Sequence, residues 1–95
     1  MKEIRTSDVF DKWLMKLRDD RAIARIATRI KRLAMGNPGD SRFLGDIFEL
    51  RINCGPGYRV YYKDTGREII ILLCGGDKST QQADITKARQ LSLLY

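Results

Sequence analysis

The chain has 95 residues, a hydrophobic fraction of 43% and a formal net charge of +6, which predict one small domain, residues 1–95, with a polyanionic partner. No apolar run approaches the ~20 residues of a membrane span and no signal peptide is evident, so we expect a cytoplasmic protein with no membrane partner. Histidine is absent, which excludes a histidine-based metal site; we expect neither a metal nor another cofactor.

The first third of the chain predicts an edge strand followed by two helices. Residues 2–6 alternate in polarity, as in a short strand. From about Asp8 to Arg18, apolar residues have helical spacing, after a possible cap at Ser7 or Asp8: Phe10, Trp13, Leu14 and Leu17. A second helix, capped by Asp19 or Asp20 and stopped at Gly36, has the apolar stripe Ile23, Ile26, Ala27, Ile30 and Leu33 or Ala34. The short loop between them favours a helical hairpin packed on a sheet.

The exposed side of the second predicted helix is strongly basic. Its arginines recur at i, i+4, i+8 and i+11: Arg21, Arg25, Arg29 and Arg32. Such a stripe could follow phosphates or receive an acidic partner, although charge runs are often plain solvated faces. The sequence leaves these alternatives open.

The rest of the chain predicts a meander of strands and a last helix. A strand from Ser41 to Leu44 could bend or bulge at Gly45-Asp46 and continue to Asn53, and strands 58–63 and 68–74 follow. The last of these is nearly all apolar, as in a strand covered on both faces, yet the helical hairpin covers one face alone. Residues 80–94 predict a helix with a capping box at Ser79 and Gln82 and with Ala83, Ala88, Leu91 and Leu94 or their neighbours facing inward. The fold class is α+β, with an antiparallel-rich sheet of about four strands.

Alternation divides two of these strands into an apolar and a polar face. If residues 48–52 and 58–63 pair antiparallel, one face carries four polar or basic side chains: Arg51, Arg59, Tyr61 and Lys63. Basic groups beside an aromatic ring suit a phosphate backbone and a stacked base. The plainer alternative is the solvated outer face of a half-buried sheet.

The two cysteines and one loop lysine complete the candidate groups. Cys54 and Cys74 lack the paired spacing of a zinc or redox site, so we expect thiols, with Cys74 buried. Lys78 lies where a polar loop leaves the central strand, and by itself it reads as an ordinary loop lysine.

Four motifs spread over most of the chain, and the order of the predicted elements, resemble a known superfamily. The motifs are Gly36-Asn37-Pro38-Gly39-Asp40, Glu49-Leu50-Arg51-Ile52, Gly55-Pro56-Gly57-Tyr58-Arg59-Val60-Tyr61-Tyr62 and Gly75-Gly76-Asp77-Lys78-Ser79-Thr80-Gln81. They make the chain similar to the RelE/ParE bacterial toxins, in particular to the HigB-like branch of addiction-module killer proteins. The resemblance implies a toxin neutralised, in a hetero-oligomer, by a small antitoxin encoded beside it.

The resemblance also implies roles for individual residues. Arg59 matches the arginine that contacts the scissile phosphate in RelE-like enzymes, Arg51 matches a nearby sheet arginine, and Lys78 lies near a basic loop position. The chain departs from RelE at Ile47 and Glu49, which replace paired lysines, and near Asp84, where RelE has its catalytic tyrosine. The RelE mechanism therefore does not transfer intact.

The resulting expectation is a ribosome-dependent mRNA endonuclease that needs no metal. Arg59, Lys78 and Asp84 are the candidate catalytic residues, and Arg51, Tyr61 and Lys63 the candidate RNA-binding residues. Asp84 could be a general base, or simply an acidic residue at a helix N-terminus. Two other functions stay open: a ParE-like inhibitor that binds DNA gyrase without cutting RNA, and a basic binding module without toxicity.

Overall fold

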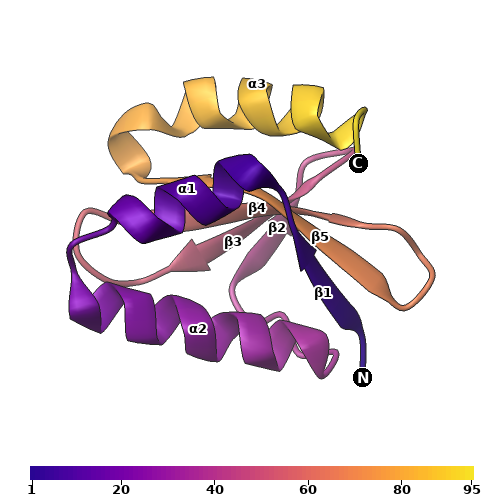
Figure 1. Ribbon diagram of the computed structural model, residues 1–95, viewed down its shortest axis with the longest axis horizontal. Coiled ribbons are helices and arrows are strands. Elements are labelled where there is room, and N and C mark those ends of the chain that lie inside the picture. The colour runs from indigo at the N-terminus through magenta and orange to yellow at the C-terminus, as the bar shows by residue number, and fades with distance from the viewer.

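The computed structural model describes all 95 residues and contains one five-stranded sheet with helices on both faces (Figure 1). The strand order is β1-β5-β4-β3-β2. β1 runs parallel to β5 and every other neighbouring pair is antiparallel. The predicted α+β class with an antiparallel-rich sheet is therefore confirmed, and the strands are β1 (Glu3–Thr6), β2 (Ser41–Phe43), β3 (Phe48–Ile52), β4 (Tyr58–Asp64) and β5 (Ile69–Gly76).

The predicted number of strands, about four, is one too few. Residues 41–53 do not form one bent strand, because the chain reverses at Gly45 and β2 pairs antiparallel with β3. Gly45 has φ +100°, which L side chains rarely adopt, and the Leu44 N–H donates to the carbonyl of Ile47 at 2.8 Å to close the turn. The expected bulge is therefore a tight hairpin.

Two capped helices precede the β2–β3 hairpin. The Ser7 hydroxyl accepts a hydrogen bond from the Phe10 N–H at 3.0 Å at the start of α1 (Asp8–Lys16). Asp19 accepts one from the Ala22 N–H at 3.0 Å at the start of α2 (Asp20–Ala34). α1 ends two residues before the expected Arg18, since Leu17 is already extended. These caps agree with the sequence.

The helical hairpin packs on one face of the sheet and forms the first core. Phe10, Ile26 and Leu33 are buried against apolar side chains of β3, β4 and β5, and Trp13 packs at the margin of this cluster. The face that α2 buries is slightly rotated from the predicted stripe: Ala22 is buried, whereas Ala27 is exposed. Small side chains carry little apolar signal, so they fix the rotation of a helix poorly.

The second core lies on the opposite face, under α3 (Gln81–Ser92), which runs along the top of Figure 1. Its buried residues are Ile47, Tyr61, Ile71, Leu73, Cys74, Ile85 and Ala88. β4 and β5 pair Tyr61 with Cys74 and Tyr62 with Leu72, so Leu73 is the extra residue of a β-bulge. α3 thus covers the second face of β5, for which the sequence suggested no cover.

The start of α3 differs from the predicted capping box. A short 3-10 helix, η1 (Lys78–Thr80), precedes it, and the Asp77 carboxylate accepts a hydrogen bond from the Ser79 N–H at 2.8 Å. Ser79 is therefore inside this turn and cannot cap α3. Of the residues expected to face inward, Ala88 is buried and Leu91 packs against the second core, whereas Ala83 and Leu94 are exposed.

Two further observations concern the whole chain. Cys54 and Cys74 are free thiols and Cys74 is buried, as expected. None of the helices has the length and the apolar character that crossing a membrane requires.

Candidate functional site

A small cationic pocket opens where β3 and β4 meet the loop between them. Its volume is about 160 Å³, and it is lined by Asp40, Arg51, Ile52, Asn53, Gly57, Tyr58 and Arg59. Arg51 and Arg59 are directly opposite each other on the two antiparallel strands. The structure therefore brings these two predicted site residues together, on the sheet face that alternation gave them.

Arg59 is held in place by two contacts. Its Nη1 donates a hydrogen bond of 2.6 Å to the carbonyl of Gly57, and its Nε lies 3.5 Å from Oε2 of Glu49 in an ion pair. Only 12% of the side chain is exposed. Gly57 has φ +82°, and a Cβ there would lie 3.1 Å from Arg59 Nη1. The turn therefore needs glycine both for its backbone and to leave room for the guanidinium.

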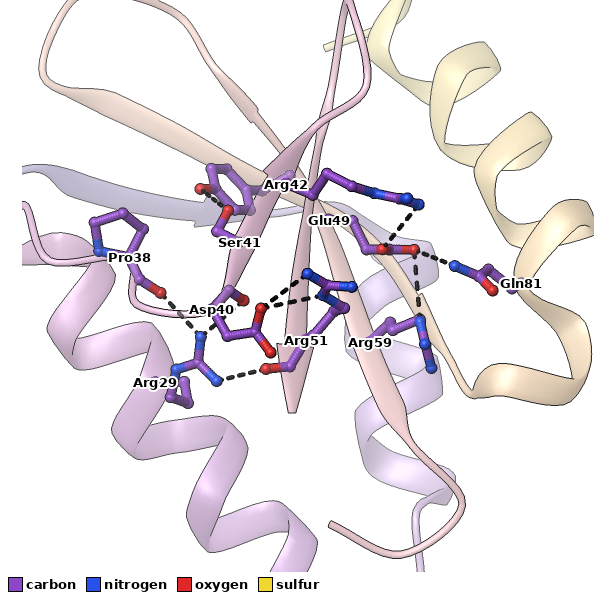
Figure 2. A network of polar contacts seen from close by, with 10 residues as sticks. Arg29, Pro38, Asp40, Ser41, Arg42, Glu49, Arg51, Arg59 and Gln81 are labelled. Atoms are coloured by element: carbon purple, nitrogen blue, oxygen red, sulfur yellow. Dashed lines mark hydrogen bonds and ion pairs between the residues drawn. The ribbon is translucent and has the colours of Figure 1, made fainter. Parts of the chain in front are cut away.

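Glu49 is the anchor of a buried polar network behind the pocket (Figure 2). Besides Arg59, its carboxylate lies 3.3 Å from Nη2 of Arg42 and accepts hydrogen bonds from the Tyr61 hydroxyl at 3.0 Å and from Gln81 Nε2 at 2.8 Å. A buried carboxylate is tolerable only when it is paired in this way. Two guanidiniums share one carboxylate, so the network keeps a surplus positive charge next to the pocket.

Arg51 connects the pocket to α2. Its Nε donates to Asp40 Oδ1 at 3.1 Å. The guanidinium of Arg29 reaches from α2 to the carbonyls of three residues, as Figure 2 shows: Arg51, Pro38 and Asp40. Arg29 thus ties the helix to the sheet and to the loop before β2, which makes it the structural member of the arginine stripe.

Lys78 lies at the rim of the same region. A Cβ on Gly57 would lie 3.5 Å from the Lys78 Cβ, and Lys78 is exposed with no ion-pair partner. Its neighbour Asp77 is held ionised, because hydrogen bonds from Ser79 above all, and the charge of Arg59 among weaker causes, lower its pKa. An exposed lysine without an ion-pair partner therefore lies close to Arg59.

The structure contradicts the predicted base contact of Tyr61 and places Lys63 away from the pocket of Arg59. Tyr61 is completely buried under α3, so its ring cannot stack on a base. Burial, followed by the charge of Glu49, raises the pKa of its hydroxyl, which excludes a tyrosinate base near neutral pH. Lys63 lies four residues along β4, about 13 Å from Arg59, and its Nζ donates to the carbonyl of Ser92 at 2.9 Å at the end of α3.

Asp84 lies in a different groove from Arg59. This groove, of about 460 Å³ between α1 and α3, is lined by Val9, Lys12, Trp13, Lys16, Gly75, Gly76, Asp77, Thr80, Asp84 and Lys87. The Asp84 carboxylate accepts a hydrogen bond from the Thr80 hydroxyl at 2.6 Å, in the first turn of α3. This placement favours the helix-terminus interpretation of Asp84 over that of a base acting with Arg59.

Two residues that shape the pocket, Glu49 and Tyr58, were not expected to do so from the sequence. Glu49 belongs to one of the motifs that carry the resemblance and replaces a RelE lysine, but its alternation with apolar neighbours predicted a solvated side chain. Tyr58 was expected on the apolar face, yet it lines the pocket as well, and burial raises its pKa. No three Cys, Asp or Glu side chains lie close enough together to hold a metal ion.

Sequence comparison connects the chain to one protein family. The model of the family described as phage-derived protein Gp49-like matches residues 12–92. A Haemophilus influenzae protein, described only as uncharacterized, is 55% identical over 91 residues, which are 95% of this chain and 92% of that protein.

Two kinds of solved structure share the fold. The crystal structure of the intact Escherichia coli RelBE toxin-antitoxin complex has a chain that is 13% identical, with a TM-score of 0.68 over 81% of this chain and 96% of that one. A metal-bound toxin from Helicobacter pylori is 22% identical, with a TM-score of 0.65 over 83% of this chain and 97% of the toxin. At these identities the similarity establishes a RelE-like fold.

Proposed function

The chain belongs to the family of phage-derived Gp49-like proteins, and from that premise we propose that it is the toxin of a type II toxin–antitoxin pair. The RelE-like fold, shared with a chain of a toxin–antitoxin complex and with a second bacterial toxin, supports the proposal. The partner is then a small antitoxin encoded next to it, which forms a hetero-oligomer with it in the cytoplasm. The activity we propose is endonucleolytic cleavage of mRNA on the ribosome.

The observation that carries this activity is the fixed guanidinium of Arg59 at a cationic pocket. Glu49 and the Gly57 carbonyl fix its direction, and Arg51 lies directly opposite on β3. An arginine stays charged at any physiological pH and offers its donors in a planar fork that matches a phosphate. A guanidinium positioned in advance stabilises the charge that develops on a phosphate in the transition state.

The reaction we propose is attack of a ribose 2′-hydroxyl on the adjacent phosphate, with the hydroxyl proton passing to water. A bond forms between the 2′-oxygen and phosphorus, the bond from phosphorus to the 5′-oxygen of the next nucleotide breaks, and the products are a 2′,3′-cyclic phosphate and a free 5′-hydroxyl. Arg59 stabilises the phosphorane-like transition state and Arg51 holds a neighbouring phosphate. Lys78 donates a proton to the leaving oxygen or binds a phosphate, because it is an exposed cation without an ion-pair partner at this rim. Positioning of the RNA by the ribosome supplies much of the rate, since orientation alone can be worth about 7–11 kcal/mol.

The test is 5′-end mapping of cellular mRNA shortly after induction of the chain. The wild type is compared with Arg59→Ala and with Arg67→Ala, which removes an exposed arginine between β4 and β5. We expect new ends inside translated frames with the wild type and with Arg67→Ala, and their loss with Arg59→Ala. Growth arrest with intact mRNA and gyrase-dependent DNA cleavage would instead establish a ParE-like inhibitor, and unaffected growth would indicate a non-toxic basic module.

A further inference from the structure

A second cationic groove runs along α2. It has a volume of about 400 Å³ and is lined by Arg21, Ala24, Arg25, Thr28, Arg29, Arg32, Ile52 and Asn53. Three of its four arginines, Arg21, Arg25 and Arg32, are exposed, and none of them forms an ion pair with a carboxylate. Arg29 is already engaged with backbone carbonyls. The groove therefore presents three cations that the fold itself does not neutralise.

This groove adjoins the pocket of Arg59. Ile52 and Asn53, at the end of β3, line both hollows, one toward α2 and the other toward Arg51 and Arg59. Arg25 bridges the junction, where its Nη1 donates to the carbonyl of Asn53 at 3.3 Å. β2 pairs only with Phe48, Glu49 and Leu50, so the end of β3 at Ile52 extends beyond it.

We propose that the α2 groove binds the sugar-phosphate backbone of single-stranded RNA on one side of the phosphate held by Arg59. The inference rests on the proposed function, of which it specifies the path of the substrate. With a rise of 1.5 Å per residue, Arg21 and Arg32 are about 16 Å apart along the helix. That length is enough for several successive phosphates of one strand.

The lining of the groove favours RNA over an acidic protein segment. A helix or peptide that docks in a groove gains most of its affinity from apolar anchors. Ala24 and Ile52 are the two hydrophobic residues of this lining, and Ile52 is only 2% exposed. Arginines without apolar anchors bind a backbone of phosphates, where release of counterions supplies the affinity.

The test compares two triple variants that lose the same charge. The groove variant is Arg21→Gln, Arg25→Gln and Arg32→Gln, which leaves the structural Arg29 intact. The control variant is Arg5→Gln, Lys31→Gln and Arg67→Gln, three exposed cations outside both hollows. Fluorescence anisotropy measures binding over a range of salt concentrations. The three fluorescent ligands are a single-stranded RNA of about twelve nucleotides, one of about three nucleotides, and a polyglutamate peptide. Urea unfolding confirms that both variants are folded.

We expect the groove variant to bind the longer RNA about tenfold or more weakly than the control variant near 0.1 M salt. Its salt dependence should also fall by about two in log–log slope, since each lost phosphate contact contributes about 0.7. The shorter RNA, which cannot occupy the Arg59 pocket and the whole groove at once, should be weakened less by the groove substitutions than the longer RNA. Equal weakening of the longer RNA in both variants, or no binding of RNA by the wild type, would overturn the proposal.

Two other outcomes separate this inference from its alternatives. If the wild type binds polyglutamate more tightly than RNA and loses it in the groove variant, the groove receives an acidic protein and the RNA proposal is wrong. If the groove variant binds RNA more weakly but still cleaves cellular mRNA, the RNA does not follow the α2 groove, and the proposed endonuclease function is unaffected. Groove-dependent binding without any mRNA cleavage would refute the endonuclease instead.

Discussion

Arg59 can act as a fixed phosphate ligand because the charge that orients it is buried. Glu49 has no exposed surface, and its carboxylate lies within 3.5 Å of polar atoms from Arg42, Arg59, Tyr61 and Gln81. Removing one partner of such a network leaves the others desolvated without compensation. The geometry of the pocket and the stability of the sheet therefore depend on the same residue.

Glu49→Gln tests this dependence. The substitution keeps the shape of the side chain but leaves the largely buried charge of Arg59 unpaired, so we expect a loss of about 3 kcal/mol in the free energy of unfolding. Urea denaturation at pH 7, followed by Trp13 fluorescence, measures it. Asp46→Asn is the control, because it breaks an exposed ion pair with Arg89 and should cost less than about 1 kcal/mol. Equal losses in the two variants would contradict the role of Glu49.

The buried thiol of Cys74 predicts a loss of stability at alkaline pH. Burial above all raises its pKa from 9.0 to about 12. Folding therefore favours the protonated thiol, and this contribution is complete below pH 9 and is lost as the pH rises from about 9 to 12. Between pH 8 and 10 it accounts for about 1 kcal/mol.

The measurement is urea denaturation at both pH values under reducing conditions. Between pH 8 and pH 10, the free energy of unfolding of Cys74→Ala should fall by about 1 kcal/mol less than that of the wild type. This difference does not depend on how stable the variant is at pH 8. Cys54→Ala is the matched control and should keep the dependence of the wild type. A Cys74→Ala variant with the same dependence would show that the thiol is not buried in its protonated form.

At the scale of the elements, α1 and α3 both pack closely against the end of β5. A Cβ on Gly75 would overlap the ring of Trp13 from α1, and a Cβ on Gly76 would overlap the carboxylate of Asp84 from α3. Neither glycine has a positive φ, so close packing and not backbone geometry excludes a side chain here. Both helices therefore depend on two residues without side chains.

Gly75→Ala should destabilise the fold by about 1–3 kcal/mol because the rigid indole ring must move. Combining it with Trp13→Leu should recover at least about 1 kcal/mol relative to the sum of the two single losses, since the substitutions act on one contact. Unfolding free energies of the four proteins of this double-mutant cycle give the coupling. Gly66→Ala is the control: it lies in a turn with φ +78° and open space around it, so its strain should add independently to Trp13→Leu. Additive losses for Gly75→Ala would contradict the contact.

How far the sequence predicts these elements depends on how local their determinants are. Alternation correctly assigned Arg51 and Arg59 to one face and Leu50 and Val60 to the other, because it is a property of the strand alone. It could not show that α3 covers the polar face, since the connection after β5 does not fix the side on which a helix packs. Tyr61 was therefore expected to be exposed, although it is a core residue, and Glu49 was expected to be solvated, although it is the anchor of Arg59.

At the scale of the whole molecule, a single sheet separates two cores. The first contains Phe10 and Ile26 from the helical hairpin, and the second contains Cys74 and Ile85 beneath α3. β4 and β5 contribute alternate side chains to both cores. If one core unfolds, these strands lose their packing on that face, and the core on their other face is destabilised as well. We therefore expect the chain to unfold as one cooperative unit.

Two probes on opposite faces of the sheet test this cooperativity. Trp13 fluorescence reports on the first core, and the reactivity of Cys74 in a Cys54→Ala background reports on the second. Both transitions should have the same urea midpoint. Ile26→Ala and Ile85→Ala should each cost about 2–4 kcal/mol and should shift both probes together, although each substitution lies in one core alone. Cys74 could instead become reactive at a lower urea concentration than the one at which Trp13 fluorescence changes, with Ile85→Ala shifting only the Cys74 transition. In that case α3 detaches from a sheet that stays folded. The Glu49–Gln81 contact, and with it the orientation of Arg59, would then depend on a separate local unfolding equilibrium.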